Sequence, residues 1–249
     1  MATHPCEART RRRAAVTLAN AVVCMPFTSP ALAAIDSDLG ELIRRFAGWQ
    51  VRNAATVGGN IANGSPIGDL SPALIALGAM LELHKGGRTR TMPLEDFFLD
   101  YKKQNRAPSE FVRAVTVPKL GQDDHFRCFK ISKRYDQDIS AVMGAVKLRI
   151  RSGKVTDARI AFGGMAATPK RARAAETKLR GLSVNDESAI HAALAILGDD
   201  FKPLDDMRAS ADYRLEAAKA LVAKAVAEIA GLPSTETRVF GARSDAHAA

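Results

Sequence analysis

The chain has 249 residues, of which 47% are hydrophobic and 25% are charged, so it is long enough for one large domain or two small ones. Its formal net charge is +9, but Lys and Arg are scattered along the chain and only 6% of the residues are aromatic. This composition argues against a nucleic-acid partner and for a solvated surface that also suits an anionic cofactor. Three cysteines, Cys6, Cys24 and Cys128, lack metal-ligand spacing and an even number, so we expect no structural metal, no iron–sulfur cluster and no essential disulfide.

Residues 1–33 have the order of a secretory signal. Four arginines between residues 9 and 13 precede a weakly apolar run, and residues 31–33 fit a small-x-small cleavage pattern. The apolar run is too short to span a bilayer, so we expect no membrane anchor. Export is therefore one interpretation of this head.

The first half of the chain predicts short elements around a glycine-rich stretch. Apolar residues recur at helical spacing over 36–49, with Asp36 or Ser37 as the N-cap. After the stretch RNAATVGGNIANGSPIGDLSP at 52–72, apolar runs and turn residues indicate a helix, a hairpin, a second short helix and a strand. The first helix is expected at 73–80, and the hairpin strands at 80–84 and 88–92 on either side of the turn 85–87. The second short helix is expected at 93–101, and the strand at 110–117.

The second half predicts longer elements after a polar boundary at 119–125. Alternating residues indicate three antiparallel strands, and RSGK supplies the turn between the last two. Three helices follow, the first with Thr168 as its N-cap and Pro169 as its first residue. Strands backed by helices form a small α+β domain. The strands are expected at 126–135, 139–150 and 154–164, and the helices at 169–179, 185–198 and 212–230.

The run TVGGNI at 56–61 is the first candidate binding site. A strand residue followed by two glycines leaves successive backbone N–H groups uncovered, which is one way to present donors to a pyrophosphate. Two glycines also form ordinary turns, and that alternative stays open. Asp69 is either a carboxylate that accepts from a ribityl or ribose hydroxyl, or the N-cap of the next helix.

Four ordered segments resemble those of a known family, the FAD-binding flavoproteins of molybdenum hydroxylases. That family includes the small subunit of bacterial xanthine dehydrogenase and the CO dehydrogenase flavoprotein. The resemblance covers roughly residues 32–240. The segments that carry it are RNAATVGGNIANGSPIGDLSPALIALGAMLEL, SEFVRAVTVPK, FKISKRYDQDISAV and VTDARIAFGGMAATPKRA.

The resemblance implies an α+β fold that holds FAD. Residues 1–33 are then an atypical head, and 34–120 are the second lobe of a two-lobed, PCMH-type FAD-binding domain. Residues 121–232 form a compact C-terminal domain, with a three-stranded antiparallel sheet and helices, and 233–249 form a flexible tail. The cofactor-lining positions of the family fall on Thr56, Gly58, Gly59, Asn60, Asn63, Gly68, Asp69, Val112 and Lys130.

Four residues have implied roles near the flavin ring. Val112 corresponds to an apolar residue that packs near the ring, and Lys130 to a basic residue that stabilises negative charge on the reduced flavin. A strand lysine that points into solvent is the alternative for Lys130. Asp136 and Asp138 lie where relatives carry acidic residues on the electron-acceptor side, and carboxylates that merely support a turn are the alternative.

Two positions depart from the family pattern. Gly68 replaces a hydroxyl residue that is common there, and Asn63 stands where relatives often have Thr or Ala. These changes loosen individual hydrogen bonds without removing the site.

The implied function is that of the flavin-subunit portion of a molybdenum hydroxylase, an FAD-dependent oxidoreductase in which this chain supplies no catalytic acid or base. Electrons pass from molybdenum through iron–sulfur clusters to FAD and then to NAD or another acceptor. The expected partners are a molybdenum-binding large subunit and an iron–sulfur domain or subunit, in the cytoplasm.

The first lobe and the cysteine-rich domain of the family have no counterpart in the sequence. We therefore expect an N-terminally truncated chain, whose signal-like head reflects a misplaced start, a frameshift or a gene fragment. A non-catalytic remnant or assembly module with weak or no FAD binding is the alternative. An exported basic binding protein is a third interpretation.

Overall fold

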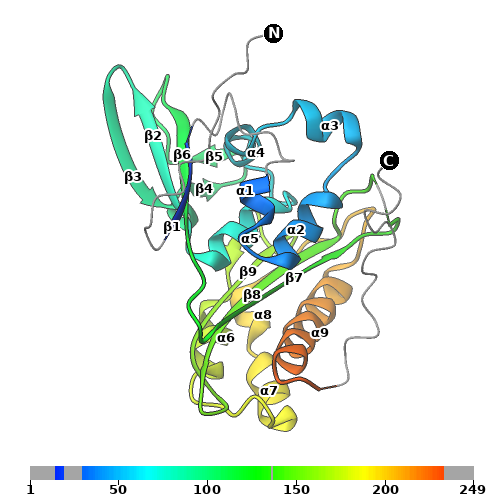
Figure 1. The fold of residues 1–249 in the computed structure, drawn as a ribbon. Coiled ribbons are helices and arrows are strands. Elements are labelled where there is room, and N and C mark those ends of the chain that lie inside the picture. The colour runs from blue at the N-terminus through cyan, green and yellow to red at the C-terminus, as the bar shows by residue number, and fades with distance from the viewer. Residues whose placement is uncertain (1–14, 20–29, 136, 233–249) are drawn as a thin grey trace, which may run out of the picture.

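The computed structural model describes residues 15–19, 30–135 and 137–232, which fold as an α+β protein. These residues form two four-stranded antiparallel sheets and one small two-stranded sheet. Figure 1 shows the first sheet at one end of the molecule and the long strands of the second sheet beneath the helices of the first half. The predicted α+β class is therefore confirmed. Most of the predicted head and the whole predicted tail lie outside the described residues.

The first four-stranded sheet has the order β1-β6-β2-β3. The predicted hairpin is present, and Gly86 and Gly87 both have positive φ in its turn. Residues 15–19, which the sequence assigned to the head, pair antiparallel with β6. The predicted strand at 110–117 is confirmed as β6. The strands are β1 (Ala15–Ala19), β2 (Met80–Lys85), β3 (Arg88–Pro93) and β6 (Phe111–Pro118).

The described residues of the first half of the chain form five short helices. The helix predicted at 36–49 is shorter than expected, because its last turn ends at Arg44 and Ala47 then takes a positive φ of 45°. Asp36 is its N-cap, as predicted, and its side chain accepts from the N–H of Asp38 at 2.8 Å. The helices are α1 (Pro30–Ala33), α2 (Ser37–Arg44), α3 (Trp49–Ala54), α4 (Val57–Asn63) and α5 (Leu70–Leu77).

Two other helix predictions in this half need correction. The helix predicted at 73–80 begins three residues earlier and ends before Gly78, whose φ of 80° stops the helix. The helix predicted at 93–101 is wrong. Only the 3₁₀ turn Leu94–Asp96 forms there, followed by β4 (Phe98–Asp100) and β5 (Lys103–Gln104). Adjacent Phe97 and Phe98 are both buried, and this packing outweighs the helix signal of the acidic first turn.

The second sheet has the order β10-β9-β8-β7. Its three long strands confirm the predicted antiparallel strands, and Ser152 and Gly153 have positive φ in the predicted turn. The fourth strand was not predicted. The strands are β7 (Asp124–Ile131), β8 (Val142–Arg151), β9 (Lys154–Gly163) and β10 (Lys170–Arg171).

The helix expected to start at Pro169 starts later, at Arg173. Lys170 and Arg171 instead extend the sheet by pairing with β9. The carboxylate of Asp200 accepts from the N–H groups of Ala174 and Ala175, so Thr168 is not the cap. The helix predicted at 185–198 is two helices, whereas the last predicted helix is confirmed. They are α6 (Arg173–Leu179), α7 (Glu187–Leu194), α8 (Leu197–Asp200) and α9 (Ala211–Ile229).

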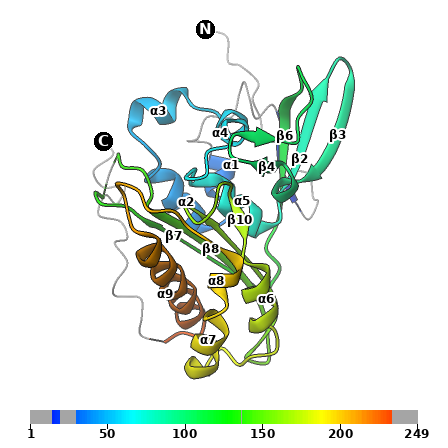
Figure 2. The same cartoon turned by 180° about the vertical axis from the view of Figure 1, so that it is seen from behind.

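The second sheet is covered on both faces. Helices α2 and α5 pack on one face, and α6 and α9 pack on the other, as Figure 2 shows from behind. Side chains of β8 therefore alternate between two cores, with Met143 and Ala145 on one side and Val142 and Val146 on the other. The two halves of the chain, before and after the predicted boundary at 119–125, thus contact each other through this sheet, because helices of the first half pack on one of its faces.

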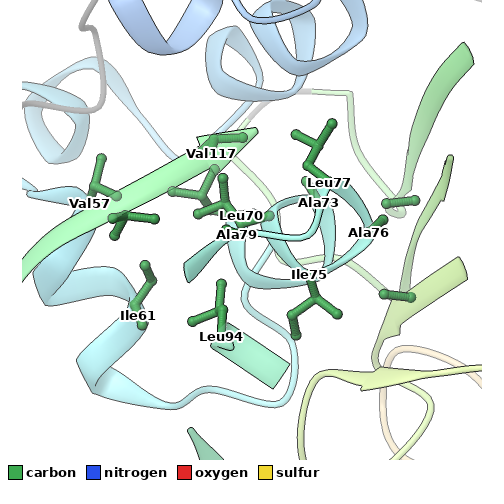
Figure 3. Close-up of a cluster of buried hydrophobic side chains, with 14 of the residues drawn as sticks. Val57, Ile61, Leu70, Ala73, Ile75, Ala76, Leu77, Ala79, Leu94 and Val117 are labelled. Carbon is green, nitrogen blue, oxygen red and sulfur yellow. The ribbon is translucent and has the colours of Figure 1, made fainter. Parts of the chain in front are cut away.

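The core of the first half fixes α4 and α5 against the first sheet. Figure 3 shows Val57 and Ile61 of α4 around the same apolar cluster as Leu70, Leu94 and Val117. Among the described residues, no helix has both the length and the apolar character needed to cross a membrane.

Candidate functional site

The glycine pair of the candidate site lies at the start of a helix. Thr56 is the N-cap of α4, and its hydroxyl accepts from the N–H of Gly59 at 3.1 Å. Gly58 and Gly59 are thus in the first helical turn, so the expected strand end and the alternative of an ordinary turn are both wrong. The first N–H groups of a helix have no intrahelical acceptor and favour an anion.

Gly59 is exposed and closely approached by its own cap. A Cβ at this position would lie 2.8 Å from Thr56 Oγ1, so a side chain here would disturb the cap. Gly58 is buried, and its neighbour Val57 packs into the core. At the start of α4, Gly59 is therefore exposed to solvent, while Val57 and Gly58 are buried and hold the helix against the core.

Asn60 carries an unsatisfied buried atom. Its Oδ1 is buried and has no hydrogen-bond partner within the described part of the chain. A buried amide oxygen without a donor is energetically costly, and ligand donors are one way to satisfy it. Asn63, the last residue of α4, is exposed.

Asp69 forms the most buried polar contact of the site. It occupies the N-cap position of α5, but its side chain makes no cap hydrogen bond. Lys130 Nζ lies 2.7 Å from Asp69 Oδ2, and the hydroxyl of Ser140 donates to Asp69 Oδ1. The Lys130 side chain is only 3% exposed, so the alternative of a lysine pointing into solvent is excluded.

The loop that contains Gly68 and Asp69 is seated on the end of β9. The N–H of Gly164 donates to the carbonyl of Pro66 at 2.8 Å. A Cβ on Gly163 would lie 3.2–3.4 Å from Pro72 Cγ and from the carbonyl oxygens of Gly68 and Pro66. Glycine suits this close approach, because a Cβ would force these neighbours to shift by a few tenths of an ångström. Gly68 itself is half-buried in this loop.

Sequence reasoning missed three residues of this arrangement. Gly163 and Gly164 lie in the quoted run AFGGM, and Ser140 lies in the quoted run DQDIS, but no role was given to any of them. Two successive glycines after a long strand were the available signal for a close approach. Ser140 had no local signal, because its partner is distant in sequence.

Val112 lies away from the Asp69 contact. It is a buried residue of β6, opposite Leu83 of β2, and belongs to the core of the first half. Helix α4 packs on β6, the strand that carries Val112.

The loop between β7 and β8 carries the predicted acidic pair. Asp138 accepts from the N–H groups of Arg134 and Ile139, which lower the pKa of Asp138 below its ordinary value. It therefore supports the turn, as the alternative interpretation held. Asp136 lies outside the described residues. Arg44, the last residue of α2, and Arg45, its C-cap, donate to the hydroxyl and the carbonyl of Tyr135 in the same loop.

The residues present fit an anionic dinucleotide. Gly59 has no side chain and is exposed, so a phosphate can approach the helix start closely, and the oxygens of Asn60 and Asp69 are acceptors of the kind that bind sugar hydroxyls. These groups are of the kind found in proteins that bind a nucleotide cofactor.

Two family models match the chain in succession. The model of the FAD-binding domain in molybdopterin dehydrogenases matches residues 8–120, and that of the CO dehydrogenase flavoprotein C-terminal domain matches residues 127–229. The chain therefore belongs to the family of FAD-binding flavoproteins of molybdenum hydroxylases. The individual contacts of the named residues with FAD stay predictions, as do the domain limits at 33 and 120.

Relatives and solved structures agree with this family. A nicotinate hydroxylase from Emericella nidulans is 35% identical over 170 residues, which cover 66% of this chain and 13% of that protein. A xanthine dehydrogenase from Oryza sativa subsp. japonica is 38% identical over 144 residues, which cover 56% of this chain and 10% of that protein. A carbon monoxide dehydrogenase from Hydrogenophaga pseudoflava has a TM-score of 0.76 at 28% identity, covering 86% of this chain and 74% of that chain.

The chain thus spans roughly a tenth of the length of these two curated relatives, since it covers 13% and 10% of them. Both relatives have oxidoreductase names, and this chain belongs to an oxidoreductase family.

Proposed function

We propose that this chain binds FAD through residues 56–69, which we call the glycine-rich segment, and serves as the flavin-binding portion of a molybdenum hydroxylase. When bound, FAD supplies the redox chemistry by accepting and releasing electrons. The chain itself binds and orients the cofactor and sets its electrostatic surroundings. None of its residues is proposed as a general acid or base.

The observation that carries this proposal is the orphan Asn60 Oδ1. It lies one residue after the exposed Gly59, in the first turns of a helix whose start favours an anion. A buried acceptor without a donor costs about 1–3 kcal/mol. A bound nucleotide with hydroxyl or amide donors would remove that cost.

Lys130 and Asp69 set the electrostatics on the other side of the segment. Their ion pair leaves no net charge between them, and Ser140 also donates to Asp69. We assign Asp69 to the sugar or ribityl hydroxyls of FAD, because a carboxylate oxygen has lone pairs beyond those used by Lys130 and Ser140. The resemblance assigns Lys130 to the reduced flavin, but its ammonium group is paired with Asp69, so we propose that Lys130 acts by holding this carboxylate in place beside the cofactor.

The rest of the electron path lies in other proteins or segments. We propose that a molybdenum-binding large subunit and an iron–sulfur domain or subunit deliver electrons to the flavin, and that NAD or another acceptor removes them. The names of the relatives support this assignment, since they are xanthine dehydrogenase, nicotinate hydroxylase and carbon monoxide dehydrogenase. We place this function in the cytoplasm, with export as the alternative.

A titration of the purified chain with FAD, followed by flavin fluorescence and absorbance, tests the proposal. Asn60→Leu is the sharpest variant. In the chain without FAD it removes an unsatisfied polar atom, so the free energy of unfolding should stay unchanged or rise. In the titration with FAD it should weaken binding by about tenfold, because the acceptor for the ligand's donor is gone. Gly59→Ala is expected to weaken binding as well, since its Cβ meets Thr56 Oγ1.

Gly40→Ala is the matched control for Gly59→Ala. Gly40 also lies in a helix, α2, but a Cβ there meets its nearest atom at an ordinary 3.4 Å. It should keep the FAD affinity of the unchanged chain. A well-folded chain that does not bind FAD would overturn the proposal and favour the assembly-module alternative.

A further inference from the structure

Arg214 is a buried arginine that touches both loops on which the glycine-rich segment rests. It lies in the first turn of α9 and is 2% exposed. Its Nη1 donates to the carbonyls of Ala141 and of Gly164, the latter at 3.0 Å, and its Nη2 donates to Asp206 at 2.6 Å. One guanidinium thus joins the start of β8 to the end of β9.

The first of these loops reaches Asp69. Ala141 follows Ser140 directly, and Ser140 is 1% exposed with its hydroxyl on Asp69 Oδ1. The Arg214 bond to the Ala141 carbonyl therefore fixes the backbone that aims Ser140. A displacement at Ala141 would change the position of the Asp69 carboxylate.

The second loop reaches Pro66. Gly164 accepts from Arg214 with its carbonyl and donates its N–H to the Pro66 carbonyl at 2.8 Å. Its φ is +82°, and a Cβ there would lie 2.4 Å from the Ala141 carbonyl oxygen. The two loops therefore touch one another at the point where Arg214 binds them.

We propose that Arg214 is a positioning residue for the cofactor site, which sets the place of residues 66–69 through Ser140 and Gly164. This inference rests on the proposed FAD binding. It adds a residue of the last helix, which itself makes no contact with the glycine-rich segment in the bonds described. A planar guanidinium suits this role because its donors are fixed in a fork that reaches several acceptors at once.

The test compares Arg214→Gln with Arg171→Gln in the full chain. Arg171 is the matched control, because it is also largely buried and paired with carboxylates, those of Glu95 and Glu176, and none of the bonds described joins its side chain to the Pro66 or Ser140 loop. Amide hydrogen exchange is measured first, without FAD. We expect the peptides that cover 64–70 to exchange about tenfold faster in Arg214→Gln and to stay unchanged in Arg171→Gln.

FAD binding gives the second readout. Arg214→Gln should raise the Kd for FAD by about tenfold, and the absorption band of the flavin at saturation should differ from that of the unchanged chain. A residue needed only for folding would leave that band unchanged in the folded fraction. Ser140→Ala removes the hydrogen bond from Ser140 to Asp69. It should also speed exchange over 64–70 and raise the Kd for FAD, so the test can still be made if Arg214→Gln does not fold.

Three outcomes decide between the two proposals. Faster exchange over 64–70 in Arg214→Gln or Ser140→Ala, absent in Arg171→Gln, supports the positioning role. Equal exchange over 64–70 in the unchanged chain and in these variants overturns it. Failure of the unchanged chain to bind FAD overturns the proposed function, and because exchange is measured without FAD, the exchange result still decides the positioning role.

Discussion

Lys130 of β7 and Asp69 at the start of α5 form a buried ion pair, with 2.7 Å between Nζ and Oδ2. The two side chains are 3% and 6% exposed, and 61 positions separate them in the chain. The pair therefore joins the glycine-rich segment of the first half to the sheet of the second half. Each of these buried charges relies on the other, because water cannot solvate a charge that has lost its ion-pair partner there.

Lys130→Met should destabilise the chain by about 3–5 kcal/mol, because it leaves the Asp69 carboxylate buried with Ser140 as its remaining side-chain partner. The double variant Asp69→Asn with Lys130→Met should cost less than the sum of the two single variants. Urea unfolding of the four proteins in this cycle measures the coupling.

Lys219→Met is the control for that cycle. Lys219 pairs with Glu216 at 2.7 Å on the surface, where the glutamate is 72% exposed, and such pairs are worth about 0–1 kcal/mol. Equal losses for Lys130→Met and Lys219→Met would contradict the importance that we assign to the buried pair.

Glu95→Gln should weaken the contact between the two halves of the chain. Glu95 lies in the first half, and its carboxylate pairs with Arg159, Arg171 and Arg173 of the second half at 3.0–3.3 Å. Arg159 is half-buried, and that burial lowers its pKa, so it depends on a nearby carboxylate. We expect a loss of about 1–3 kcal/mol in urea unfolding. Glu187→Gln is the control, because Glu187 is 82% exposed. If Glu95→Gln loses no more stability than Glu187→Gln, the prediction is refuted.

The sequence predicted those parts of the fold that local pattern controls. Both hairpins, the three long strands and α9 follow from alternation, turn glycines and helical spacing. Two helix predictions failed where distant partners decided the outcome. Asp200 caps α6 in place of Thr168, and the burial of Phe97 and Phe98 replaces a helix by a 3₁₀ turn and a strand.

The candidate site was predictable in part, for the same reason. Gly59, Asn60 and Asp69 lie within one quoted stretch of 21 residues, at 52–72, so a local motif finds them. Ser140 and Arg214 act over 71 and 73 positions, on Asp69 and on the Ala141 carbonyl, and no local pattern marks them. Only the three-dimensional arrangement identifies them.

Acid should remove a specific contribution of Glu110 to stability. Hydrogen bonds from the Arg90 side chain and from the Ala107 N–H lower the pKa of Glu110 from 4.5 to about 2. Because the folded value lies below the unfolded one, this contribution is present above pH 4.5 and is lost as the pH falls toward about 2. The unchanged chain should therefore lose more stability across that window than Glu110→Gln does.

Thermal unfolding of both proteins at a series of pH values measures this difference. Glu187→Gln is again the control and should keep the pH dependence of the unchanged chain, because the Glu187 carboxylate is exposed. Parallel curves for the unchanged chain and Glu110→Gln between pH 4.5 and about 2 would show that the Arg90 contact does not act on the carboxylate as inferred.

Gly164→Ala should be among the most damaging single changes at the site. Gly164 has a φ of +82°, and an added Cβ would lie 2.4 Å from the Ala141 carbonyl oxygen. The conformation costs about 1–2 kcal/mol for an alanine, and the collision adds about 1–3 kcal/mol. Gly153→Ala isolates the first contribution, because Gly153 has a φ of +72° with nothing within 4 Å of its Cβ position. Urea unfolding should show a larger loss for Gly164→Ala, and FAD titration should show weaker binding in that variant alone. Equal losses for the two variants would mean that the Ala141 loop moves freely, and residues 66–69 would then not be fixed through Gly164.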